Sequence, residues 1–307
     1  MAINYHQVGK TLKKLREQQE LSQDKLSDGI MNRSNYAKLE QGTQTVSKGK
    51  LSLLLNRLGC AAQQFFPYPL TEAEFKVYSL RDHFDNCMAR LDINGMRSIL
   101  KEMEALSDFK EGLHRQFLLK SKAALLLMKD NNTHDSQLLL DEAIKMTIPK
   151  FQAHLINTYL LGREDIEIVN MIADVNDKSG HRDTAILILT KLAANIRKRY
   201  VDPNEKARSL TLTLFNLSNF VGLDKKYNDA LQLCNEGIEA GENNRVFTQL
   251  PMLKFNKAYC LFHLNQPEEV ESLVFQAYYG CLSQGQASYA EMIEKHSYRF
   301  LQITIKK

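Results

Sequence analysis

Tryptophan is absent from this 307-residue sequence, proline occurs only six times and glycine fourteen times. This composition excludes a collagen-like or low-complexity chain and favours an all-helical protein. No apolar stretch approaches the roughly 18 residues that a membrane helix needs, and the polar N-terminus lacks the pattern of a secretory signal. The five cysteines are scattered and odd in number. They suit reduced, buried thiols better than a disulfide framework, so we expect a cytoplasmic protein that does not enter membranes.

The signatures of common catalytic and metal sites are also missing. Neither phosphate-binding glycine motif, GxxxxGK[ST] or GxGxxG, occurs, and HExxH, CxxC and GxSxG are absent. The eight histidines never pair at a ligand spacing. The segment from Ser107 to Lys110 matches SxxK without the other elements of that chemistry, and we interpret it as coincidence. We therefore expect no enzyme, no metal and no cofactor.

The positive charge is concentrated near the N-terminus. Residues 1–66 contain ten lysines and arginines against five acidic residues, a net charge of +5, whereas the whole chain carries +4. The other four fifths of the chain are therefore nearly neutral. A small basic module attracts phosphate groups and releases counterions when it binds nucleic acid. A solvated surface with excess lysine is the alternative, and charge alone does not decide between the two.

Two prolines in three residues mark a domain boundary. Pro67 and Pro69 cannot lie inside a helix and favour an extended chain before them. Thr71 then has the character of a helix N-cap, because the acidic residues Glu72 and Glu74 follow it. We predict a first domain over residues 1–66, a linker over 67–71 and a second domain over 72–307.

The first domain is predicted to contain five short helices. The predicted helices span residues 6–19, 23–28, 33–40, 48–58 and 61–66. Ser22, Asn32 and Ser47 are placed to cap the second, third and fourth of them, and Gly42 follows the end of the third.

At these residues the sequence resembles a known family. Ser22-Gln23-x-x-Leu26, followed by Asn32-Arg33-Ser34-Asn35-Tyr36-x-Lys38-x-Glu40-x-Gly42, resembles the XRE (Cro/repressor-like) helix-turn-helix over residues 5–66. The stretch 39–47 resembles more narrowly the Rgg/GadR/MutR regulators, in which a phenylalanine-glutamate-arginine-glycine run precedes an isoleucine-serine pair. This chain departs from that pattern at Gln41, where arginine is usual, and carries Lys48 where some relatives have a cysteine.

The resemblance implies that the third helix reads the major groove of DNA. Arginine can recognise guanine through two hydrogen bonds, and asparagine can recognise adenine in the same way. Helix N-termini and basic side chains suit phosphate contacts. The base-reading candidates are Arg33, Ser34, Asn35 and Lys38, and the phosphate-contacting candidates are Arg16, Gln23, Ser47, Lys48 and Lys50. The alternative is a small helical bundle that binds protein through a polar exposed helix.

Beyond residue 71, apolar residues recur at helical spacing, and loop signals recur about every 20 residues. This pattern predicts an array of antiparallel helix pairs. Three pairs carry small or apolar residues twelve positions apart, at Ala173 and Ala185, Ser218 and Ala230, and Ala258 and Val270. They resemble the packing positions of tetratricopeptide repeats, although the pairs are spaced by 45 and 40 residues instead of 34. Segment 286–305 is predicted to cap the array.

In such a solenoid the first helices line the concave face. An asparagine amide donates and accepts at once, so it can hold a peptide backbone whatever its side chains, and aromatic walls can bury apolar side chains. The predicted peptide-binding residues are Glu167, Asn170, Asp174, Phe215, Asn216, Asn219, Met252, Phe255, Asn256, Tyr259 and Phe262. Each phenylalanine could equally belong to the core. A row of acidic residues near position 170 could favour the cationic end of a ligand.

The order of a helix-turn-helix, a proline-broken linker and a degenerate repeat resembles the RRNPP regulators, especially their Rgg branch. The resemblance implies a cytoplasmic, homodimeric transcription factor that binds double-stranded DNA at two-fold or repeated half-sites. It also implies that a short signalling peptide binds the helical body and shifts its conformation. The alternative is an XRE regulator whose body binds a small metabolite or a partner protein.

Overall fold

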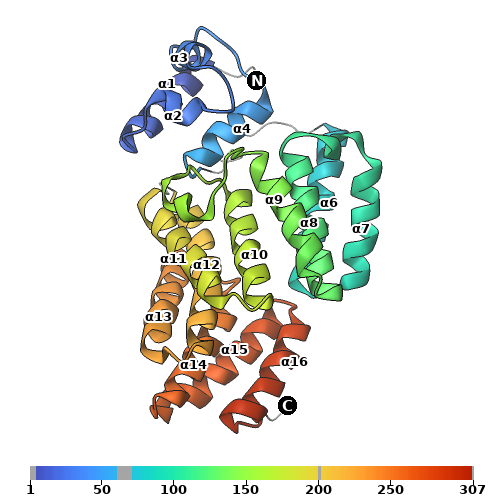
Figure 1. Cartoon of the computed structure of the whole chain (residues 1–307), viewed down its shortest axis with the longest axis vertical. Coiled ribbons are helices and arrows are strands. Elements are labelled where there is room, and N and C mark those ends of the chain that lie inside the picture. Colours follow the sequence, from blue (N-terminus) through green and yellow to red (C-terminus); the bar gives the residue numbers. More distant parts are fainter. Residues whose placement is uncertain (1–4, 61–70, 200–201, 306–307) are drawn as a thin grey trace.

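The computed structural model describes residues 5–60, 71–199 and 202–305, and within these ranges it contains helices and no β-strand (Figure 1). The predicted all-α class is confirmed. We refer to residues 5–60 as the head and to residues 71–305 as the body. The predicted helix 61–66 and the linker residues 67–70 lie outside the described residues.

The head contains four helices, α1 (Tyr5–Gln18), α2 (Gln23–Ser27), α3 (Arg33–Glu40) and α4 (Lys48–Arg57). The three predicted caps are confirmed: the side chains of Ser22, Asn32 and Ser47 accept hydrogen bonds from the backbone N–H groups three residues ahead. Leucines and Tyr36 fill one small core. A Cβ atom at Gly9 would lie only 2.1 Å from the carbonyl oxygen of Leu39, so glycine lets α1 cross α3 closely.

The body consists of five helix pairs and a terminal helix. The first helices of the pairs are α6 (Glu72–Ala89), α8 (Gly112–Asp130), α10 (Arg163–Lys178), α12 (Pro203–Leu223) and α14 (Leu250–His263). The second helices are α7 (Ile93–Ala105), α9 (Thr133–Lys145), α11 (Arg182–Arg199), α13 (Tyr227–Asn243) and α15 (Val270–Ser283). Short 3₁₀ segments lie at Ser107–Lys110, Ala153–Thr158 and Pro267–Glu269, and α16 (Ala287–His296) continues into a π-helical turn, Ser297–Leu301.

The predicted helix N-cap at Thr71 is confirmed. Its hydroxyl accepts from the backbone N–H of Glu74 at 3.2 Å, while the Glu74 carboxylate accepts from the backbone N–H of Thr71 at 2.9 Å. This reciprocal capping box explains why the chain becomes helical directly after the prolines. The predicted terminal helix is shorter than expected, because α16 ends at His296 and the π-helical turn follows it.

The three predicted small-residue pairs lie at the contacts between paired helices. All six residues are buried, and Ala173, Ala185 and Ala230 are fully so. Successive first helices also pack on one another, from α8 to α10, α12 and α14. Successive second helices make no comparable contacts in the described chain. The first helices from α8 to α14 therefore form one continuous layer, and the second helices pack on the first helices more than on one another.

The head sits on one end of the body (Figure 1). Leu160, which precedes α10, is only 8% exposed because it packs into the leucine core of the head. Arg57 of α4 donates to the carbonyl oxygens of Leu26 and Thr147, at 3.0 and 3.3 Å, so it links the head to the body. None of the helices in the described ranges is both long and apolar enough to cross a membrane.

Candidate functional site

The third helix of the head lies at the end of the molecule farthest from the body (Figure 1). Asn32 Oδ1 accepts from the Asn35 backbone N–H at 2.8 Å and fixes the start of this helix. Arg33, Ser34 and Lys38 are exposed and Asn35 is half-buried. The Arg33 side chain lies 3.8 Å from Asp24, and both side chains are 67% exposed. The structure thus presents Arg33, Ser34 and Asn35 in the first turn of α3 and Lys38 in its last turn.

Three further candidates lie at the start of α4. Ser47, Lys48 and Lys50 are all exposed. The Ser47 hydroxyl accepts from the backbone N–H of Lys50 at 3.4 Å. Lys48 donates to the Glu74 carboxylate at 3.1 Å, across the boundary between head and body. The structure therefore leaves Lys50 in solvent, whereas Lys48 already has an acidic partner on α6.

Arg16 and Gln23 have a different environment from the one predicted. Both donate to the carboxylate of Glu40, at 2.6 and 2.8 Å, and Arg16 also donates to the Leu21 carbonyl oxygen at 2.7 Å. Burial alone would raise the pKa of Glu40, but the hydrogen bonds from Arg16 and Gln23 outweigh it and hold the pKa below its ordinary value. Since the Arg16 side chain is only 11% exposed, we assign it to holding α1 against α3 instead of to a phosphate contact.

Two of the predicted peptide-binding asparagines lie in the seams between first helices. Asn170 is 3% exposed, donates to the Thr213 hydroxyl at 3.1 Å and accepts from Asn216 at 3.0 Å. Asn256 is 9% exposed and donates to the Ser218 hydroxyl at 3.0 Å. These amides join α10 to α12 and α12 to α14, so we correct their role from ligand contact to structural contact. Asn219 is half-buried and has no hydrogen-bond partner among the described residues.

The predicted apolar wall also divides into buried and accessible parts. Met252 and Phe255 are each 7% exposed within the core of the last repeats, which corrects the prediction that they line an open face. Phe215, Tyr259 and Phe262 are half-buried and pack against the same core. These three rings and Asn219 remain partly open to a ligand, as do the half-buried polar residues Glu167, Asp174 and Asn216.

A buried charge cluster surrounds Lys120, which the sequence reasoning missed. The Lys120 ammonium is 4.6 Å from the centroid of the Phe117 ring and 2.7 Å from Glu164, and it also contacts Glu167. Burial raises the pKa of the neighbouring Asp85 to about 6, against the opposing field of Lys120. Glu167, a predicted ligand contact, is thus held by Lys120 and by Arg163 at 3.0 Å. The available signal was the position of Lys120, directly after the apolar residues from Phe117 to Leu119.

Asp174 lies on the next turns of the same helix. It is half-buried and pairs with Lys178 at 3.3 Å. Burial raises its pKa above the ordinary value, with Lys178 opposing the rise. Asp174 is therefore a partly accessible acid within an ion pair of its own helix.

The start of α10 joins the charge cluster to the head. Asp165 accepts from the Thr147 hydroxyl at 2.5 Å and from Gln116 at 2.9 Å. The Thr147 carbonyl oxygen accepts from Arg57 of the head. Glu164, the preceding residue of the same turn, contacts Lys120. One helical turn thus contacts both the interior of the body and the segment on which the head rests.

Known protein families and solved structures resemble this chain in its head and in its overall fold. Residues 12–65 match the helix-turn-helix family, and no curated protein matches the chain in sequence. PlcR of Bacillus thuringiensis, solved with the peptide PapR7 and DNA, is similar at 17% identity and a TM-score of 0.61, over 94% of this chain and 99% of PlcR. The apo form of PlcR is similar at 15% identity and a TM-score of 0.57, over 94% of this chain and 98% of that structure. ComR of S. thermophilus, solved with DNA and its signalling peptide ComS, is similar at 15% identity and a TM-score of 0.51. The likeness covers 95% of this chain and 99% of ComR.

This chain has the fold of the RRNPP regulators. The family resemblance drawn from the sequence is confirmed at the level of fold, since the likeness extends over head and body together. The head contains a helix-turn-helix. The RRNPP fold accounts for the order of a small capped bundle followed by helix pairs.

Proposed function

We propose that this protein is a cytoplasmic, homodimeric transcription regulator that binds a short signalling peptide in its body and double-stranded DNA through α3. The observation that carries the proposal is the exposed, capped α3, with Arg33, Ser34 and Asn35 at its start, on a chain with the RRNPP fold. PlcR and ComR were solved with DNA and a peptide, which supports the same two partners here. A dimer would place two heads on two half-sites.

The DNA part is tested by footprinting the promoter of this gene with the full chain. Arg33→Ala removes a guanidinium that can recognise guanine, so we expect protection of the specific site to disappear while the melting temperature stays unchanged. Lys198→Ala is the matched control, because Lys198 is exposed on the body and far from α3 along the chain. An unchanged footprint for Arg33→Ala contradicts the regulator assignment.

The peptide part is tested with a library of short apolar peptides titrated against the full chain. Asn219→Ala removes an unpaired amide and is expected to weaken the best binder about tenfold, the effect of losing about 1.4 kcal/mol. Asn228→Ala, on an exposed residue of α13, is the control. If no peptide binds while a metabolite from a cell extract does, the alternative of a metabolite-sensing XRE regulator replaces the peptide proposal.

The coupling of the two parts would pass through the first turn of α10. A peptide that shifts Glu164 and Glu167 also shifts Asp165 and the Thr147 segment that Arg57 contacts. Such a shift changes the population of head positions only if the peptide binds one arrangement better than the other. Arg57→Lys removes the forked contact to Leu26 and Thr147, and is expected to make DNA affinity less dependent on the peptide.

A further inference from the structure

The gap between the second helices α9 and α11 forms a cavity in the body. The cavity has a volume of about 590 Å³, within the range of small-molecule sites. Its floor is the side of α10 that carries Ile172, Val175 and Asn176. Glu167 and Asp174, predicted for the peptide, do not line it. The cavity is therefore distinct from the face on which the proposed function places the peptide, and the inference goes beyond that function.

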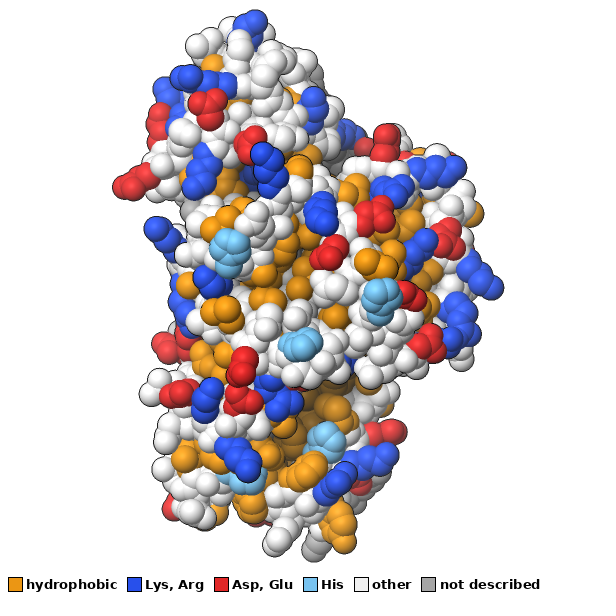
Figure 2. Space-filling model, in the orientation of Figure 1, with side chains coloured by type: hydrophobic (Ala, Val, Ile, Leu, Met, Phe, Trp, Pro, Cys, Tyr) orange, Lys and Arg blue, Asp and Glu red, His pale blue; other side chains and the backbone are white. Residues whose placement is uncertain are grey.

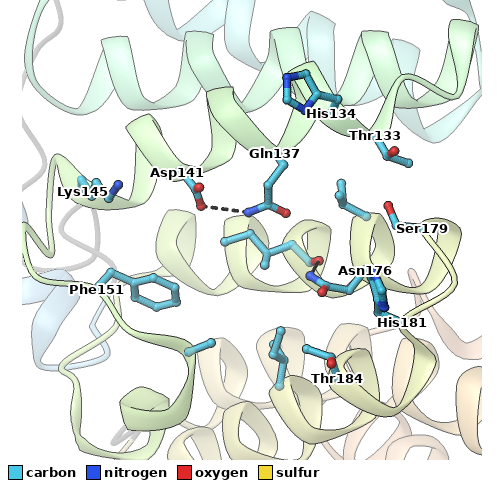
Figure 3. Close-up of a pocket in the computed structure, with 14 residues that line it drawn as sticks. Thr133, His134, Gln137, Asp141, Lys145, Phe151, Asn176, Ser179, His181 and Thr184 are labelled. Atoms are coloured by element: carbon cyan, nitrogen blue, oxygen red, sulfur yellow. Dashed lines mark hydrogen bonds between the residues drawn. The ribbon is translucent and has the colours of Figure 1, made fainter.

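The two amide side chains of the cavity present their oxygens and not their N–H groups. Gln137 donates to Asp141 at 2.8 Å, and Asn176 donates to the carbonyl oxygen of Ile172 at 2.7 Å. Their amide oxygens accept no hydrogen bond from the described residues. Figure 3 shows the Gln137 oxygen directed toward the side of the cavity where Asn176 lies. Two neutral acceptors and the carboxylate of Asp141 thus line the same cavity.

The rest of the lining favours a ligand with one apolar part. Phe151 lies at one end (Figure 3), and Ala153, Ile172 and Ile188 are further apolar residues of the lining. Figure 2 shows hydrophobic side chains gathered in this gap between α9 and α11. Thr133, Ser179 and Thr184 add hydroxyls at the opposite end (Figure 3). Lys145 is the only lysine or arginine of the lining and lies at its edge.

We propose that this cavity binds a small organic cation, an ammonium or guanidinium compound with an apolar part. An ammonium group donates three hydrogen bonds and accepts none, which matches two amide oxygens and one carboxylate. The acidic partner Asp141 makes the contact charge-assisted. An anion of the same size would be repelled by Asp141 and would face the two amide oxygens, and it would find donors only among Lys145, His134, His181 and the hydroxyls of the lining. The apolar part of the ligand lies against Phe151 and the isoleucines.

The experiment is isothermal titration calorimetry of the full chain with four probes. Phenethylamine and agmatine supply the ammonium and guanidinium groups, and 2-phenylethanol and 3-phenylpropionate supply the neutral and anionic counterparts. We expect at least one cation to bind, and to bind at least tenfold more tightly than both counterparts. No binding by either cation, or equal binding by the acid, overturns the proposal.

Two variants change the site in opposite directions. Asp141→Asn removes the charge and is expected to weaken cation binding about tenfold. Thr184→Asp adds a carboxylate in the first turn of α11, where the helix dipole tolerates it, and is expected to strengthen binding several-fold. Asp229→Asn, an exposed aspartate in the first turn of α13, is the matched control and is expected to change affinity less than twofold.

Melting temperatures of the three variants show whether each one folds. If Asp141→Asn does not fold, Thr184→Asp still decides the outcome, because a cation site predicts tighter binding and any other site does not. Unchanged affinity in both variants overturns the proposal. Peptide binding to the opposite face is measured in the same variants, and its retention separates failure at this cavity from failure of the proposed function.

Discussion

The head and the body use polar side chains in opposite ways. In the head, Arg33, Ser34 and Lys38 of α3 are exposed and Asn35 is half-buried, and the buried ion pair of Arg16 with Glu40 holds the bundle. In the body, Asn170 and Asn256 are buried between helices. A short helix on a small bundle has one packed face, whereas the first helix of a repeat packs against its pair and against both neighbours. Most polar positions of such a helix are therefore structural.

Among the variants that test this comparison, Lys120→Met has the largest expected effect on stability. The change removes the ammonium and leaves Glu164 with Arg81 and Glu167 with Arg163 as their remaining partners, so we expect a loss of about 3 to 4 kcal/mol of unfolding free energy. Urea denaturation measures the loss. Lys122→Met, two residues along on α8 and 35% exposed, is the control and is expected to change stability by less than about 0.5 kcal/mol. Equal effects of the two variants would contradict the buried role of Lys120.

The next test separates the two arginines of the head. Arg16→Ala leaves the buried Glu40 carboxylate with Gln23 alone, so we expect a loss of about 3 kcal/mol in stability. Arg33→Ala is expected to leave stability within about 0.5 kcal/mol and to remove specific DNA binding. Thermal denaturation and footprinting on both variants provide the comparison. The assignment of Arg16 fails if its replacement leaves the melting temperature unchanged.

The third test uses the pH dependence of Asp85. Burial raises its pKa from the ordinary 3.8 to about 6, so the folded chain binds this proton more tightly than the unfolded chain. Its contribution to stability is therefore complete below about pH 4 and is lost as the pH rises through 6. We expect Asp85→Asn to gain about 2 kcal/mol relative to the wild type between pH 4 and pH 7.

The control for Asp85 is Asp82→Asn, an exposed residue on the same helix. Urea denaturation at several pH values compares the two variants. A stability difference between Asp85→Asn and the wild type that does not change with pH would show that the carboxyl ionises normally in the folded chain.

The smallest expected effect distinguishes the two kinds of asparagine in the body. Asn170→Ala removes contacts to Thr213 and Asn216 and should cost about 1 to 2 kcal/mol of stability. Asn219→Ala should leave stability unchanged within about 0.5 kcal/mol and should affect only ligand binding. If Asn219→Ala is the more destabilising variant, the division between buried and accessible amides is wrong.

These contrasts explain what the sequence could predict. Caps such as Asn32 and Thr71 depend on atoms three residues apart, and they were confirmed. The small residues at Ala173 and Ala185 follow from the packing of one helix pair, and they were confirmed too. The inner face was predicted less well, because burial of Asn170 depends on Thr213, which lies in the next repeat.

The charge cluster and the cavity between α9 and α11 have the same origin. Lys120 finds its acidic partners more than 40 residues away, on α10. The cavity exists because α9 and α11 do not pack together. This separation cannot be predicted from the residues of either helix alone. Features that arise from the spacing between repeats therefore require the three-dimensional structure.

Leu160 carries a consequence for protein engineering. This leucine belongs to the body along the chain, yet it completes the apolar interior of the head. A fragment that ends before it would expose a leucine-sized hole to water. A chimera that transfers these first sixty residues to another receptor will retain a filled interior only if the new host supplies a leucine at the matching place.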